Sequence, residues 1–175
     1  MIYIETQHLY IRDWKRSDLQ SLVALNRDSN VMKYFLKTLT PTESIGLFNR
    51  FKDNLDNQGY GLFAIERKED QAFIGFVGFN TFDFDTDFAP GIEIAWRLHT
   101  DYWNKGYATE AAQACLKYAR ENLDFETVYS FTTRQNKRSE QVMIKIGMSK
   151  VKEFEHPQIP KDHPLLHHVL YRIKL

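Results

Sequence analysis

The sequence predicts a layered α+β or α/β fold, in which a mixed sheet carries helices on both faces. Apolar residues alternate with polar ones in several short runs, which is typical of strands, and recur at helical spacing in others. The two kinds of run are interleaved along the chain with short turns between them. The 175 residues, of which 43% are hydrophobic, can bury one sizeable core and are too few for two ordinary domains. We therefore expect a single domain over residues 1–175.

Caps and turns mark the elements of the first third of the chain. Residues 9–14 have the alternation of a strand, and the capping-box pattern at 17–20 favours the start of a helix. A second start signal at 40–43 predicts another helix, because Pro41 suits a first turn, where its missing N–H costs nothing. Gly59 should end that helix.

Strands and two more helices should complete the fold. The runs 60–67 and 72–82 are separated by a short polar turn and should pair antiparallel. The next run, 91–98, alternates strictly and precedes an alanine-rich helix. Beyond that helix we expect a strand at 127–133, a helix from Asn136, and two last strands at about 150–156 and 168–174.

A loop with a single glycine, at 102–106, joins the 91–98 strand to the alanine-rich helix. The first turn of a helix leaves N–H groups unpaired and carries partial positive charge, so anions bind there. Gly106 has no Cβ to hold a ligand away from the backbone. The loop lacks the glycines of a Walker-type loop and of a dinucleotide fingerprint. It therefore indicates either another kind of phosphate site or an ordinary strand-to-helix turn.

A second motif follows at 136–148, where Asn136 and Ser139 precede an apolar stripe that ends at Gly147. A purely structural interpretation is available, since Asn136 is a favourable N-cap and glycine commonly ends a helix. That interpretation explains neither Ser139 nor the earlier glycine loop.

Together the two motifs resemble those of the GNAT acetyltransferase superfamily, and most closely its RimJ/RimL-like branch, the ribosomal-protein N-acetyltransferases. In that branch a tryptophan commonly stands where this chain has Trp103, and Tyr-Ala-Thr-Glu-Ala commonly follows the glycine, as at 107–111. Asn104 replaces a frequent glycine. The resemblance implies a mixed, mostly antiparallel central sheet whose strands at 92–98 and 127–133 splay apart to admit the acyl-CoA arm.

The same resemblance implies an activity. We expect an N-acetyltransferase that uses acetyl-CoA and moves an acetyl group to a primary amine by direct transfer in a ternary complex. The amine is either a protein N-terminus or a small molecule. Two alternatives stay open: a small-molecule or antibiotic amine acetylase in place of a protein N-terminal acetylase, and a non-catalytic acyl-CoA-binding regulatory domain.

Three residues are candidates for the chemistry. Glu93 is the candidate general base, because an amine must lose its proton near neutral pH. Alternation puts Glu93 on the face opposite Ile92 and Ile94, so it meets the cleft only if the cleft is on that face or a bulge re-aims the strand. Otherwise it is a solvent-facing carboxylate. By resemblance, a backbone N–H near Trp96 stabilises the oxyanion and Ser139 protonates the departing thiolate; the alternative for Ser139 is an exposed hydroxyl in a first turn.

Cofactor contacts are implied by the resemblance as well. The backbone amides from Trp103 to Thr109 should receive the pyrophosphate, the Leu98 backbone should pair with the pantetheine arm, and Asn136 should bond a pantetheine amide. Basic residues of the two motifs are candidates for the remaining phosphate charge, with solvated surface side chains as the alternative. The full set of cofactor candidates is Leu98, Trp103, Asn104, Lys105, Gly106, Tyr107, Ala108, Thr109, Asn136, Lys137 and Arg138.

Composition limits the remaining function classes. The net charge of zero argues against a general nucleic-acid surface, and the single cysteine, Cys115, is expected to be a buried small residue. We expect no metal, because the acidic run 83–87 lacks the glycine and glutamate of a calcium loop and the histidines at 163–168 have no cysteine beside them. With no signal peptide and no long apolar run, we expect a cytoplasmic protein with no membrane partner, as a monomer or homodimer.

Overall fold

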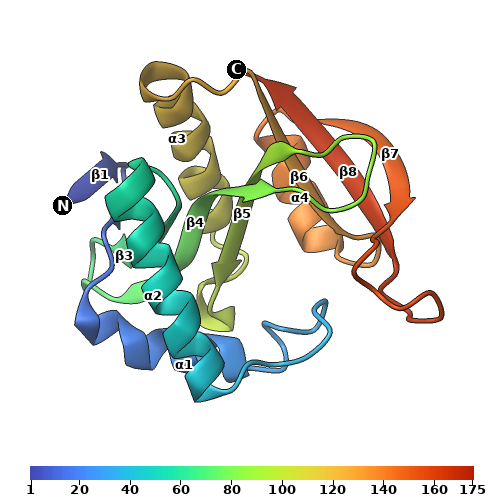
Figure 1. Cartoon of the computed structure of the whole chain (residues 1–175). Helices are drawn as coiled ribbons and strands as arrows, with labels where there is room; N and C mark the ends of the chain where they lie inside the picture. Colours follow the sequence, from blue (N-terminus) through green and yellow to red (C-terminus); the bar gives the residue numbers. More distant parts are fainter.

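One eight-stranded sheet forms the centre of the molecule, and the computed structural model describes every residue from 1 to 175 (Figure 1). The strands are β1 Ile2–Glu5, β2 Leu9–Arg12, β3 Leu62–Arg67, β4 Phe73–Phe82, β5 Gly91–Leu98, β6 Thr127–Thr133, β7 Ser149–Glu155 and β8 His167–Lys174. They lie in the order β1-β2-β3-β4-β5-β6-β8-β7. Only β5 and β6 pair parallel, so the predicted mixed, mostly antiparallel sheet is confirmed.

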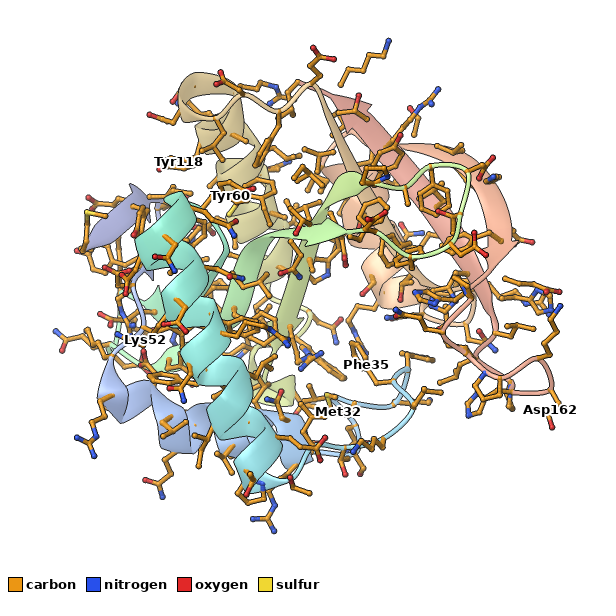
Figure 2. All side chains as sticks on the ribbon, viewed as in Figure 1. Met32, Phe35, Lys52, Tyr60, Tyr118 and Asp162 are labelled. Atoms are coloured by element: carbon orange, nitrogen blue, oxygen red, sulfur yellow. The ribbon has the colours of Figure 1, made fainter.

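Helices cover both faces of the sheet (Figure 1). They are α1 Leu19–Arg27, α2 Pro41–Gln58, α3 Tyr107–Asn122 and α4 Lys137–Lys145, with short 3-10 turns η1 at Arg16–Asp18 and η2 at Thr100–Tyr102. Phe51 of α2 packs against Phe76 of β4 on one face. On the other face Tyr118 of α3, labelled in Figure 2, packs against Phe63 of β3. None of these helices combines the length and the apolar character that crossing a membrane would need.

Most predicted elements are confirmed, and two local features differ. Helix α2 begins at the Thr40 capping box and ends at Gly59, whose φ is 72°. The sequence does not predict β1, which extends the sheet beyond β2. The capping box predicted at 17–20 is wrong, because the turn before α1 is capped instead by Lys15, whose N–H donates to Asp18 Oδ2 at 2.7 Å.

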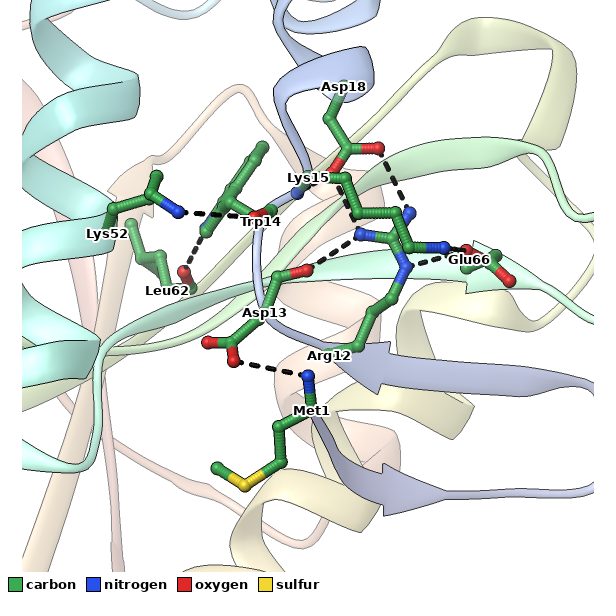
Figure 3. Close-up of polar contacts among 9 residues, drawn as sticks. All are labelled: Met1, Arg12, Asp13, Trp14, Lys15, Asp18, Lys52, Leu62 and Glu66. Atoms are coloured by element: carbon green, nitrogen blue, oxygen red, sulfur yellow. Dashed lines mark hydrogen bonds and ion pairs between the residues drawn. The ribbon is translucent and has the colours of Figure 1, made fainter.

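A group of charged residues, three of them buried, explains that cap. Arg12, Lys15, Asp18 and Glu66 meet beside β2 and β3, and we call them the Arg12 cluster (Figure 3). Arg12 Nε donates to Glu66 Oε2 at 2.6 Å, and its Nη1 and Nη2 donate to the two Asp18 oxygens at 2.8 and 3.0 Å. Lys15 Nζ donates to Glu66 Oε2 at 2.9 Å. Arg12 therefore holds the Asp18 carboxylate in place, and this carboxylate accepts the hydrogen bond from the Lys15 N–H that caps the turn.

Strands β5 and β6 separate along most of their length. β5 pairs with β4 from Gly91 to Leu98 without a register shift, but its ladder with β6 consists of the Glu93–Tyr129 pair alone. One side-chain bond adds to that pair, from Ser130 Oγ to the carbonyl of Ile94 at 3.1 Å. The expected splayed pair is therefore confirmed, and it opens the sheet at its centre.

Candidate active site

A cavity of about 1700 Å³ opens where β5 and β6 separate. Its walls come from both motifs, from the strands β4, β5 and β6, and from the loop at 30–36 that follows α1. All three predicted catalytic residues, Glu93, Trp96 and Ser139, line it. Every predicted cofactor residue except Lys105 lines it too. The fold thus brings together segments that are far apart in the sequence.

Backbone direction along β5 follows from its pairing with β4. The N–H of His99 donates to the carbonyl of Ile74 at 3.0 Å, which shows that the odd-numbered residues of β5 are the ones whose backbone groups bond to β4. In an antiparallel ladder alternate residues turn their backbone groups away from the partner strand. The N–H and C=O groups of Ile94, Trp96 and Leu98 therefore point away from β4, toward the side where β6 diverges.

Two of the three carbonyls on that side have partners within the chain. Ile94 O accepts from Ser130 Oγ at 3.1 Å, and Leu98 O accepts from the indole Nε1 of Trp103 at 3.0 Å. The N–H of Trp96 has no acceptor in the chain, because the β5–β6 ladder does not extend to it. A backbone donor is thus free in the cavity wall, which is what an oxyanion site requires.

Glu93 enters the cavity directly, without a bulge. It is paired with Asn80 of β4, so its side chain is on the face that carries Phe76 and faces α1 and α2. The carboxylate is half-buried and makes no hydrogen bond or ion pair. Burial raises the pKa of Glu93 to about 8. Such a carboxyl can exchange a proton near neutral pH, as a general base for an amine must.

The glycine loop presents a row of free donors. No group of the chain accepts a hydrogen bond from any backbone N–H between Asn104 and Thr109. The predicted row began one residue earlier, and its first member is wrong, because the N–H of Trp103 donates to the carbonyl of Thr100 at 3.1 Å. Asn104 and Gly106 have left-handed φ angles of 59° and 80°, a backbone conformation that is typical of anion-binding nests. A Cβ on Gly106 would meet no atom of the chain within 4 Å, so within the chain itself this glycine is explained by its left-handed φ angle. The close approach of a ligand to its backbone stays a prediction. The loop fits a pyrophosphate.

Asn136 caps α4 and orients Ser139. Its Oδ1 accepts from the Ser139 N–H at 3.4 Å, and its Nδ2 donates to Thr132 Oγ1 at 2.9 Å and to Ser139 Oγ at 3.1 Å. Ser139 is half-buried, and its oxygen accepts from Asn136, so its own hydrogen is free to be donated. The cap interpretation is confirmed, and it leaves a donor hydroxyl on the cavity wall.

The basic candidates have different surroundings. The Arg138 guanidinium lies 3.7 Å from the centroid of the Trp103 ring, so the two motifs stack on each other. Lys137 forms an ion pair with Glu140 at 3.1 Å, and Lys105 is exposed without a carboxylate partner. Sequence reasoning missed the Trp103–Arg138 stack, since no local pattern relates the two residues.

One charged residue of the cavity was also missed. Arg97 is on β5 four positions after Glu93 and lines the same cavity. Its Nη1 donates to Asn26 Oδ1 at 2.8 Å, and Phe35 packs over its guanidinium. A signal existed in the sequence, because strand alternation puts Arg97 on the same face as Glu93.

Comparisons with known proteins agree with this geometry. Residues 8–149 match the family model described as Acetyltransferase (GNAT) domain. A Bacillus subtilis protein named uncharacterized N-acetyltransferase YnaD is 32% identical over 149 residues, which cover 84% of this chain and 82% of the relative. The crystal structure of a GNAT-family acetyltransferase from Bacillus anthracis superimposes with a TM-score of 0.82 at 27% identity, over 99% of this chain and 98% of that one. The microcin C7 self-immunity acetyltransferase MccE, solved with acetyl-CoA and AMP, shares the fold with a TM-score of 0.79 at 14% identity, over 97% of this chain and 94% of that one.

Proposed function

The chain belongs to the GNAT acetyltransferase domain family, and we propose that it is an N-acetyltransferase that moves an acetyl group from acetyl-CoA to a primary amine. GNAT acetyltransferases use acetyl-CoA. The observation that carries the proposal is the juxtaposition on β5 of a half-buried carboxylate without a partner, Glu93, and a free backbone donor, the N–H of Trp96. We further propose the RimJ/RimL-like branch, which the residues Trp103 and 107–111 support.

Each requirement of direct transfer has a residue in the cavity. When bound, acetyl-CoA supplies an activated acyl group as a thioester. Glu93 takes a proton from the amine as its nitrogen bonds to the acyl carbon. The Trp96 N–H stabilises the negative charge that develops on the acyl oxygen. As the carbon–sulfur bond breaks, Ser139 donates a proton to the departing thiolate, which needs only a modest donor because a thiol has a pKa of about 8.5. Ser139 then takes a proton back from solvent, and Glu93 releases to solvent the proton that it took from the amine, so that both groups return to their starting states.

Cofactor binding is assigned to backbone groups first. The N–H groups from Asn104 to Thr109 would receive the pyrophosphate, and the partial positive charge of the α3 N-terminus supports the same contact. Along the pantetheine arm, the Leu98 carbonyl already accepts from Trp103, so the N–H of Leu98 and the carbonyl of Trp96 are the groups that remain for pairing.

The test is release of free thiol from acetyl-CoA in the presence of peptide, polyamine and small-molecule amines, with mass spectrometry of the acceptors. A ternary complex predicts intersecting initial-rate patterns and no acetylated protein. Ping-pong kinetics together with an acetyl adduct on the protein would overturn direct transfer. Tight binding of acetyl-CoA without turnover on any amine would favour the alternative of a non-catalytic acyl-CoA-binding domain.

A further inference from the structure

Arg97 has an unusual setting beside the proposed active site. Its guanidinium carbon is 4.4 Å from the ring centroid of Phe35 and 5.1 Å from that of Phe76, so aromatic rings hold it in place. Figure 2 labels Phe35 on the loop that follows α1. Nη1 donates to Oδ1 of the fully buried Asn26 at 2.8 Å, and Asn26 in turn donates to Ser44 Oγ at 3.0 Å. The side chain is therefore fixed at one end.

The other edge of the same guanidinium has no partner in the chain. Arg97 takes part in no ion pair, its Nε is buried without a hydrogen bond, and its Nη2 makes none. In a guanidinium group Nε–H and Nη2–H point the same way, and this edge is the one that holds a carboxylate by two parallel bonds. Burial lowers the pKa of Arg97 to about 10, which leaves the group charged at neutral pH. A charged group that is half-buried, with its Nε fully buried, is costly unless something pairs with it.

The surrounding lining does not supply that partner. Asp83 and Glu93 are the acidic residues of the cavity wall, and neither forms an ion pair with Arg97. Glu93 is four positions away along the same face of β5, which corresponds to about 13 Å between Cα atoms at 3.3 Å per residue. One acceptor molecule can therefore present its amine to Glu93 and a second group to Arg97.

We propose that the acceptor is an amine that also carries a carboxylate, and that the free edge of the Arg97 guanidinium binds this carboxylate while the amine lies at Glu93. The inference rests on the proposed acetyltransferase function and narrows its substrate class. Two kinds of molecule carry both an amine and a nearby carboxylate: a free ω-amino acid, and a peptide with an acidic side chain next to its N-terminus. The test therefore includes both.

The experiment compares kcat/KM for pairs of acceptors that differ only in the charge of the distant group. An ω-amino acid is paired with its carboxamide, and a peptide with Asp or Glu in the second position is paired with its Asn or Gln counterpart. For the wild-type protein we expect the carboxylate member of at least one pair to be preferred by about 10-fold to 100-fold, as charged hydrogen bonds of this type contribute. The preferred pair identifies the source of the carboxylate.

Substitution of Arg97 should remove the preference through KM. In Arg97→Gln, KM for the carboxylate member rises to that of its neutral counterpart, whereas kcat/KM for the neutral member changes little. Arg97→Lys keeps the charge but not the two-bond edge, so an intermediate preference is expected. The matched control is Lys33→Gln, which removes an exposed positive charge from the same cavity wall and should keep the full preference.

Two results separate the inference from the function on which it rests. Equal kcat/KM for both members of every pair in the wild-type protein overturns the inference while the acetyltransferase function stands. No turnover with any amine overturns both. A purely structural role of Arg97 would lower kcat/KM equally for both members, so a uniform loss in Arg97→Gln and Arg97→Lys, each shown to be folded by thermal melting, also contradicts it.

Discussion

Two groups of charged side chains in this molecule are organised in opposite ways. In the Arg12 cluster each charge has a partner in the chain, since Arg12 bonds Asp18 and Glu66 at 2.6 to 3.0 Å (Figure 3). On β5, Glu93 and Arg97 lie on one face of the same strand, and neither has an oppositely charged partner. The first arrangement is complete without a ligand, whereas the second is not.

The pKa values of Glu66 and Glu93 differ in the same way as their partners do. Burial by itself would raise the pKa of Glu66, but hydrogen bonds from Lys15 and Arg12 hold it below its usual value. Burial of Glu93 is not opposed in this way and raises its pKa to about 8. The comparison teaches that burial alone does not set the pKa of a carboxyl group; the presence or absence of a partner within the chain decides the direction of the shift.

Removing Arg12 should have the largest effect on stability. Arg12→Met leaves the buried carboxylates of Asp18 and Glu66 without their main partner, and we expect the free energy of unfolding to fall by about 3–5 kcal/mol. Urea unfolding measures it. The control is Lys37→Met, which breaks an exposed ion pair with Glu43 and should change stability by less than about 1 kcal/mol. A similar loss in both variants would contradict a special role for the Arg12 cluster.

Removing the charge of Glu93 should act on turnover instead. We expect Glu93→Gln to lower kcat/KM by about 10²- to 10⁴-fold, the usual contribution of a general base. Because the pKa of Glu93 is about 8, wild-type kcat/KM should rise as the pH increases through 8, and the variant should lack this limb. A pH–rate profile that is identical in the two proteins would remove Glu93 from the role of base.

The same variant has a stability signature of defined sign. A carboxyl whose pKa is about 8 in the folded protein and 4.5 in the unfolded chain binds its proton more tightly when folded. The wild-type protein should therefore lose stability relative to Glu93→Gln as the pH rises from about 4.5 through 8. Melting temperatures of the two proteins across this range measure the difference, and a constant difference would show that Glu93 is not desolvated.

Truncation of Arg97 tests how much the charged residue of β5 contributes to stability, in comparison with Arg12. Arg97→Met removes no ion pair, but it leaves the buried Oδ1 of Asn26 without its donor. We expect a loss of about 1–3 kcal/mol in urea unfolding, smaller than that of Arg12→Met. A loss equal to or larger than that of Arg12→Met would mean that Arg97 is mainly a structural residue.

Ser139 is a neutral group whose hydroxyl uses only one of its hydrogen-bonding positions within the chain. Its oxygen accepts from Asn136, and its hydrogen is free. We expect Ser139→Ala to lower kcat by about tenfold, less than the usual effect of an acid or base, because a thiolate leaves readily. Rapid-quench or steady-state thiol release measures it, with unchanged KM for acetyl-CoA. Full turnover in the variant would leave Ser139 as part of the helix cap alone.

The smallest expected effect is at the cofactor loop. Gly106→Ala introduces a Cβ that meets no atom of the chain within 4 Å, so in the unliganded protein the cost comes from its left-handed φ of 80° and is about 1–2 kcal/mol. We expect KM for acetyl-CoA to rise by less than about tenfold while the amine preference stays the same. A change in the amine preference would show that this loop also contacts the acceptor.

Much of the fold could be predicted, because its signals are local. The Thr40 capping box and the left-handed Gly59 mark the two ends of α2 from residues within one turn of each end. The strand before the cofactor loop and the glycine of that loop are likewise read from neighbouring residues. The roles of Glu93, Trp96 and Ser139 stay predictions, although all three line one cavity.

The sequence by itself thus determined the four helices and every strand except β1, and it indicated free backbone donors at the start of α3, because caps, alternation and glycine turns depend on nearby residues. Only the tertiary structure decided which charges are paired. Arg12 meets Glu66 across 54 positions, and Arg97 meets Asn26 across 71, and no local pattern encodes such contacts. Pairing depends on sheet register and on the packing of remote segments, so the difference between a structural arginine and one free to bind a substrate appears only in the folded chain.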